Sequence, residues 1–135
     1  MKSLLFALPF LLVSCASTPS KPDAPAAAAG AVKYRYENSL DLRNDNTLNH
    51  VVVTGYDEKS LGEATRLDVS AGGAVLSLRN KSDVGGAMYN PKVELSKQGT
   101  LLVSWGEIDD AYGKAELAAD EAGNLTIKKW KEGSY

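Results

Sequence analysis

From residue 32 to the end of the chain, apolar and polar side chains alternate with a period of two in short runs. Runs of this kind, when Gly, Asn and Asp bound them, are typical of antiparallel strands with one buried face. We therefore expect an all-β domain, either a small antiparallel β-sandwich or a barrel. The pattern predicts about eight short strands, at Val32 to Glu37, Leu48 to Tyr56, Ala64 to Val69, Ala74 to Asn80, Pro91 to Leu95, Thr100 to Trp105, Tyr112 to Ala118 and Leu125 to Trp130.

The segments between these runs carry turn-forming residues. One segment is ambiguous: Asp110 to Asp120 has the apolar spacing of a helix, but it contains Gly113, and a hairpin fits it equally well. Both Gly-Gly pairs, at 72–73 and 85–86, are expected in hairpin turns. The full set of expected turns is residues 44–46, 71–73, 85–86, 98–99 and 122–124.

The alternation also predicts the core, because residues two apart in a strand share a face. Each such side chain contributes roughly 1.5 to 3 kcal/mol when it is fully buried. The expected core residues are Tyr34, Tyr36, Val51, Val53, Leu67, Val69, Leu76, Leu78, Leu101, Val103, Trp105, Leu125 and Ile127.

The N-terminal residues have the layout of a secretory signal: a charged start, an apolar run from Leu4 to Val13, and small residues before Cys15. At about 1.5 Å per helical residue, the run covers only about half of a hydrocarbon core of about 30 Å. A permanent membrane span is therefore not expected here.

The residues Leu12-Val13-Ser14-Cys15 resemble the lipobox of bacterial lipoproteins. The resemblance implies cleavage before Cys15 and attachment of a diacylglyceryl group to its thiol. Ala16, rather than aspartate, follows the cysteine, which implies the inner leaflet of the outer membrane in a Gram-negative host, with the inner membrane and the cell surface as open alternatives. Several acyl chains suffice for stable anchoring.

The chain is expected to have three parts. Residues 1–14 form the lipoprotein signal peptide, residues 15–31 the lipidated cysteine with a Pro- and Ala-rich tether, and residues 32–135 the β domain. The tether has no large apolar side chain to bury, so nothing offsets the entropy of ordering it. It would hold the domain in the periplasm.

The charge of the chain limits the classes of partner it can bind, and its cysteine content excludes an internal disulfide. The chain has 15 Lys and Arg against 17 Asp and Glu, a net charge of −2, and removal of the signal takes away Lys2 to leave 14 − 17 = −3. A mildly acidic surface argues against nucleic acid and anionic headgroups as main partners. With one cysteine in all, no internal disulfide can form.

Few residues suggest catalysis or metal binding. His50, the single histidine, is expected to be a strand-end or core residue, and no zinc site, Cys/His pair or GxSxG elbow is found. Glu107, Asp109 and Asp110 cluster after a strand and are interpreted as a solvated loop, with acid/base catalysis or calcium binding as the alternative. We expect no cofactor and no metal.

Two further motifs favour structural interpretations. Residues 41–46 contain Asp41, Asn44, Asp45 and Asn46 without the spacing of a helical calcium loop, which predicts Asx turns. Residues 128–131, Lys-Lys-Trp-Lys, combine an aromatic ring with cations, as a contact for a saccharide or an anionic polymer would. The favoured interpretation is an edge strand with Trp130 half buried and lysines that block edge-to-edge pairing.

Residues 75–103 resemble the central hairpins of membrane-bound inhibitors of C-type lysozyme, which are small β-barrel lipoproteins. Ser82, Gly86 and Tyr89 match part of the family's serine-rich loop, and Lys97 with Gly99 match part of its lysine-containing turn. The resemblance implies that loop and turn enter the lysozyme cleft, where Lys97 would meet acidic groups. The family's central serine and its disulfide are missing, and the alternative is that residues 85–99 are simply two turns.

Three functions therefore remain open. The first is a non-enzymatic module that binds an envelope protein or peptidoglycan, or supports envelope assembly. The second is a periplasmic lysozyme inhibitor, and the third is an enzyme that uses carboxylates.

Overall fold

The computed structural model describes residues 30–81, 86–107 and 110–134. This part of the chain contains no α-helix, and so none that is long and apolar enough to cross a membrane. It forms eight strands, as the alternation predicted: β1 (Ala31–Leu40), β2 (Asn49–Asp57), β3 (Arg66–Ser70), β4 (Leu76–Leu78), β5 (Tyr89–Leu95), β6 (Leu101–Gly106), β7 (Ala111–Ala119) and β8 (Leu125–Ser134).

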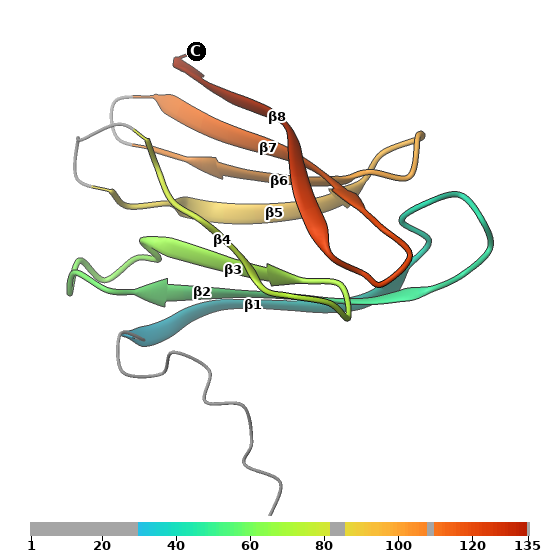
Figure 1. The fold of residues 1–135 in the computed structure, drawn as a ribbon. Helices are drawn as coiled ribbons and strands as arrows, with labels where there is room; N and C mark the ends of the chain where they lie inside the picture. The colour runs from blue at the N-terminus through green and yellow to red at the C-terminus, as the bar shows by residue number, and fades with distance from the viewer. Residues whose placement is uncertain (1–29, 82–85, 108–109, 135) are drawn as a thin grey trace, which may run out of the picture.

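The strands form two antiparallel sheets of four strands each, with the order β1-β2-β3-β4 in one and β5-β6-β7-β8 in the other. The sheets lie one above the other as a small sandwich (Figure 1), which confirms the all-β prediction. The connection from β4 to β5 passes from the first sheet to the second, so Gly86 lies in a crossover. Gly85 lies outside the described residues, but β4 and β5 do not pair, so the hairpin expected around residues 85–86 was wrong.

The core lies between the inner faces of the two sheets. In β6, for example, Leu101, Val103 and Trp105 are buried, and the residues between them are not. Leu42, Ala64, Met88, Ala115 and Leu117 also join the core, although the strand pattern did not single them out. Tyr34, Tyr36 and Leu76 are only partly buried at its margin, and the other predicted core residues are buried, except Ile127.

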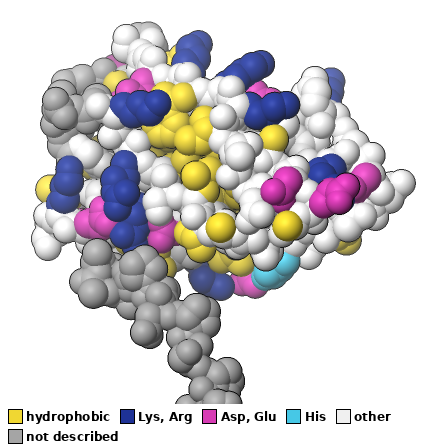
Figure 2. All heavy atoms as spheres, viewed as in Figure 1, with side chains coloured by type: hydrophobic (Ala, Val, Ile, Leu, Met, Phe, Trp, Pro, Cys, Tyr) yellow, Lys and Arg dark blue, Asp and Glu magenta, His cyan; other side chains and the backbone are white. Residues whose placement is uncertain are grey.

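The prediction that Ile127 belongs to the buried core was wrong, because 43% of its surface is exposed. It pairs with the buried Leu117 and so belongs to the inner face. However, β8 is an edge strand with a neighbour on one side only. Hydrophobic side chains reach the surface between β4 and β8 (Figure 2).

The ambiguous segment at 110–120 is the strand β7, and its glycine explains why. Gly113 is buried directly opposite Trp105 of β6. A Cβ atom at this position would overlap the indole ring of Trp105. The glycine therefore allows β7 to pass under a large aromatic side chain.

Two tryptophans tie the crossover to the second sheet. Trp105 and Trp130 lie with ring centroids 5.4 Å apart, and the Trp105 Nε1 donates hydrogen bonds to Asn80 and Glu107. The Lys81 Nζ lies 4.5 Å from the centroid of the Trp130 ring. Trp130 is thus half buried on an edge strand, as predicted for residues 128–131.

Aspartates organise the loops. The Asp41 carboxylate accepts hydrogen bonds from the backbone N–H groups of Asp45 and Asn46, at 3.1 and 3.0 Å, which confirms the Asx turns expected at 41–46. The buried Asp57 accepts bonds from the N–H groups of Leu61 and Gly62, at 3.0 and 2.7 Å. These contacts replace the water that each loop would otherwise need.

Candidate functional site

Of the residues singled out from the lysozyme-inhibitor resemblance, the described ones, Gly86, Tyr89 and Lys97, are spread from the crossover to the far end of β5. Gly86 lies in the crossover with φ +74°, Tyr89 begins β5, and Lys97 follows the opposite end of that strand. At about 3.3 Å per residue, the length of β5 separates Tyr89 from Lys97 by roughly 20 Å. Ser82 and Cys15 lie outside the described residues.

The acidic cluster after β6 is only partly described, because Asp109 lies outside the described residues. Glu107 accepts a hydrogen bond from the Trp105 Nε1 at 3.2 Å, and Asp110 is exposed with φ +59°. No group of three or more His, Cys, Asp and Glu side chains within residues 30–81, 86–107 and 110–134 is arranged to hold a metal ion.

On the outer face of the β1–β4 sheet, several charged side chains lie in ion pairs with one another. His50 is exposed on this sheet, with its Nε2 2.8 Å from a Glu37 oxygen, so it is near the strand end and not in the core. Arg66 and Arg79 both contact the carboxylate of Glu58. These bonds, above all that from Arg79, hold the pKa of Glu58 below its usual range. The charges of these residues are therefore paired with one another on the same sheet.

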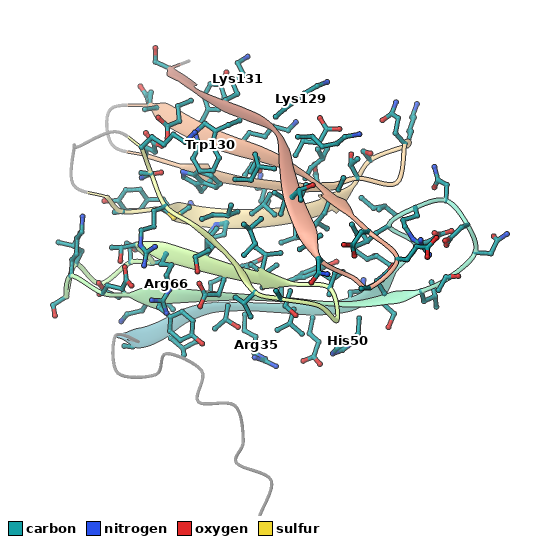
Figure 3. All side chains as sticks on the ribbon, in the orientation of Figure 1. Arg35, His50, Arg66, Lys129, Trp130 and Lys131 are labelled. Carbon is teal, nitrogen blue, oxygen red and sulfur yellow. The ribbon has the colours of Figure 1, made fainter. Side chains whose placement is uncertain are left out.

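The outer face of β5–β8 is different, because lysines gather on it. Lys92 of β5 is opposite Ser104 of β6, Ser104 is opposite Lys114 of β7, and Lys114 is opposite Lys131 of β8. Lys129 is opposite Glu116 on the same face. We call this surface, with its four lysines, the lysine face. Figure 3 shows Lys129 and Lys131 pointing away from the sandwich and Trp130 pointing into it.

A hollow of about 400 Å³ opens on the lysine face. A second hollow of about 210 Å³ adjoins it, and Lys114 lines both. The first is lined by Tyr89, Asn90, Lys92, Ser104, Trp105, Gly106, Tyr112, Gly113 and Lys114, and the second by Lys114, Glu116, Lys129 and Lys131.

The first hollow exists because Gly106 has no side chain. In the strand register, Gly106 stands between Tyr89 and Tyr112 on the same face. A Cβ at Gly106 would meet only Tyr89, at the ordinary contact distances of 3.6 and 3.7 Å. The floor between the two phenol rings is therefore open and is not needed for packing.

Two β-bulges direct side chains to this face. In β5 the pairing shifts between Tyr89 and Lys92, where Asn90 has φ +46°. Because of the extra residue, Tyr89 and Lys92 share a face although they are three residues apart. In β8 the pairing shifts near Lys128, and the strand beyond it turns Lys129 outward and Trp130 inward. Bulges are enriched beside functional sites, where they re-aim side chains.

The charges of the lysine face are weakly compensated. Within the described part of the chain, no carboxylate lies in ion-pair distance of Lys92 or Lys114. Lys129 lies 3.7 Å from Glu116 but is 80% exposed. A hydrogen bond with Tyr112 raises the pKa of Lys131, so this amine stays protonated. Like charges directly opposite each other, such as Lys114 and Lys131, destabilise a sheet, so fold stability does not explain the arrangement.

Sequence reasoning missed Lys92, Lys114 and Gly106. Both lysines lie at polar positions of predicted strands, so the outward direction of their side chains could be inferred. Their proximity depends on the register of β5, β6 and β7, which no local pattern encodes. The local signals that were present are the Tyr112-Gly113-Lys114 run in β7 and the Lys-Lys-Trp-Lys run at residues 128–131.

Comparisons of the chain with models of protein families, with curated proteins and with solved structures find no match.

Proposed function

We propose that this chain is a lipid-anchored envelope protein whose β domain binds an acidic envelope glycan through the lysine face, without catalysing a reaction. The observation that carries the proposal is the group of lysines around the hollow floored by Gly106. The lipobox-like residues ending at Cys15 support the anchor and the location in the envelope.

The lining of the first hollow fits a saccharide with acidic groups. Tyr89 and Tyr112 offer aromatic rings to the apolar faces of a sugar, and Asn90 and Ser104 offer hydrogen bonds to hydroxyl or amide groups. Lysine amines attract carboxylates or phosphates. The domain is acidic overall, so this local excess of positive charge confers selectivity on one face.

The same lining supports binding in preference to catalysis. Neither a carboxylate nor an imidazole is among the residues that line the first hollow. General acid/base catalysis most often uses one of these groups, with its pKa tuned to lie near the operating pH. The open, shallow surface also suits an extended ligand that dissociates readily.

The test is cosedimentation of the mature, detergent-solubilised protein with purified peptidoglycan sacculi. The double variant Lys92→Ala/Lys114→Ala should bind at least about ten-fold more weakly, a loss of about 1.4 kcal/mol. The matched control is Lys33→Ala/Lys97→Ala, which removes the same charge from exposed positions outside the lysine face. Binding should also weaken as salt rises from 0.1 to 1 M, since the Debye length falls from about 10 to about 3 Å. Equal binding by both double variants would refute the proposal.

A further inference from the structure

We infer that the two hollows are successive subsites for one carboxylate-bearing wall glycan, which crosses the strands from β5 to β8. This inference rests on the proposed function and adds the class, direction and minimum length of the ligand. The wall glycan is peptidoglycan-like in chemistry: amino sugars in a linear chain, with acidic groups repeated along it.

Two parallel rows of side chains set the direction. One row is Lys92, Ser104, Lys114 and Lys131, and the adjacent row is Tyr89, Gly106, Tyr112 and Gly133. Both rows run across the strands, which are spaced about 4.8 Å apart, so each is about 14 Å long. A chain lying along them would place its rings over the tyrosine row and its acidic groups over the lysine row.

Space for a ring is provided at one point of the tyrosine row. A Cβ on Gly133 would lie 3.1 Å from the Tyr112 hydroxyl, so this phenol leans over Gly133 toward β8. The lean leaves the surface above Gly106 uncovered between the rings of Tyr89 and Tyr112. One sugar ring would sit there, next to Lys92 and Lys114.

The second hollow extends the site toward the edge of the sheet. Lys129 and Lys131 bound it together with Lys114, and Glu116 is the acidic residue in its lining. Glu116 already accepts a hydrogen bond from the Thr100 hydroxyl at 2.9 Å and lies 3.7 Å from Lys129. The hollow therefore keeps a net positive charge for the next acidic group of the same chain.

The charge of the domain favours the wall over the anchoring membrane. The domain is mildly acidic overall, which disfavours anionic headgroups as its main partner. Gly30, the first described residue, leads into β1 of the opposite sheet, and the lysine face is the far side of the sandwich (Figure 1). The lysine face is therefore opposite the side on which the tether joins the domain, and it is open to a polymer of the layer beyond.

The experiment measures the affinity of the mature, detergent-solubilised protein for soluble peptidoglycan fragments of one, two and three disaccharide units. Gly106→Leu should fill the first subsite and weaken binding of every fragment by about ten-fold or more. Lys129→Ala should leave the affinity for the shortest fragment within about two-fold of that of the unchanged protein, because Lys129 lines only the second hollow. It should weaken binding of the longer fragments by about five-fold, because these fragments occupy both hollows with one linked chain. An unchanged melting temperature of each variant separates loss of a subsite from loss of the fold.

The outcomes are distinct. If Lys129→Ala weakens binding of all fragments equally, or of none, the two-subsite arrangement is wrong although the proposed function stands. The lipid anchor inserts into neutral and anionic vesicles alike, so the two are compared. A preference for anionic over neutral vesicles that Lys92→Ala/Lys114→Ala removes, with fragment binding unchanged in that variant, would overturn the choice of ligand. If neither sacculi nor any fragment binds the unchanged protein, the proposed function fails with the inference.

Discussion

Two glycines in neighbouring strands give the sharpest test of the packing. Gly113 of β7 faces the core, and a Cβ added there would overlap the Trp105 ring. Gly106 of β6 lies on the lysine face, and a Cβ added there would make only ordinary contacts with Tyr89. The substitutions Gly113→Ala and Gly106→Ala therefore add the same methyl group to opposite faces of one sheet.

The two substitutions should change the free energy of unfolding by different amounts and with different signs. The overlap at Gly113 lies roughly 1 Å inside the carbon contact distance of about 3.5 Å, and over-packing of this kind costs about 1 to 3 kcal/mol. Displacing the indole also endangers the hydrogen bonds of the Trp105 Nε1, each worth about 0.5 to 1.5 kcal/mol. Gly106→Ala should be neutral or stabilise by up to about 1 kcal/mol, because it reduces the entropy of the unfolded chain.

Urea unfolding followed by tryptophan fluorescence measures both variants. With a slope of about 2 kcal/mol per molar urea, a loss of 2 to 4 kcal/mol lowers the midpoint of Gly113→Ala by about 1 to 2 M. The midpoint of Gly106→Ala should not fall. Equal midpoints for the two variants would refute the assignment of Gly113 to the core and of Gly106 to the outer face.

Three other predictions concern pH, anchoring and lysozyme. Backbone hydrogen bonds, above all that from Leu61, hold the pKa of the Asp57 carboxyl below its usual range. The ionised carboxylate therefore stabilises the folded state. This stabilisation is complete above the unfolded pKa of about 3.9 and is lost as the pH falls through the lower folded pKa. The melting temperature should drop at acid pH, and Asp57→Asn should flatten that drop. Cys15→Ser should abolish incorporation of labelled fatty acid and move the protein from the membrane fraction to the soluble fraction; persistent labelling would contradict the assigned acceptor. Because Tyr89 and Lys97 lie at opposite ends of β5, Lys97→Ala should not alter any inhibition of C-type lysozyme that the protein shows.

The sequence predicted the strands well because their signals are local. Alternation in β2 and β6 identified Val51, Val53 and Leu101 as inward-facing, and turn residues marked most strand ends. Burial at the sheet edge was not predictable in this way, since Ile127 has the right face but no outer neighbour. The crossover near Gly86 was missed for the same reason: local turn chemistry does not say which strands pair.

The sequence indicated residues 128–131 as a possible saccharide contact, but it did not indicate the rest of the candidate site, because that depends on strand register and on bulges that interrupt the alternation. A strict alternation through β8 would give Ile127, Lys129 and Lys131 the same face, and Trp130 the other. The extra residue near Lys128 reverses this, so that Trp130 packs toward Trp105 while the lysines face solvent.

Each bulge therefore serves the core and the outer surface at once. In β8 the bulge lets Trp130 pack against the core while Lys129 and Lys131, next to it in the chain, stay in water. In β5 it allows the buried Met88 and the outward Tyr89 and Lys92 to follow one another. Both edge strands of one sheet carry a bulge, and both bulges place lysines on the same face, an arrangement that supports the proposal of a ligand there.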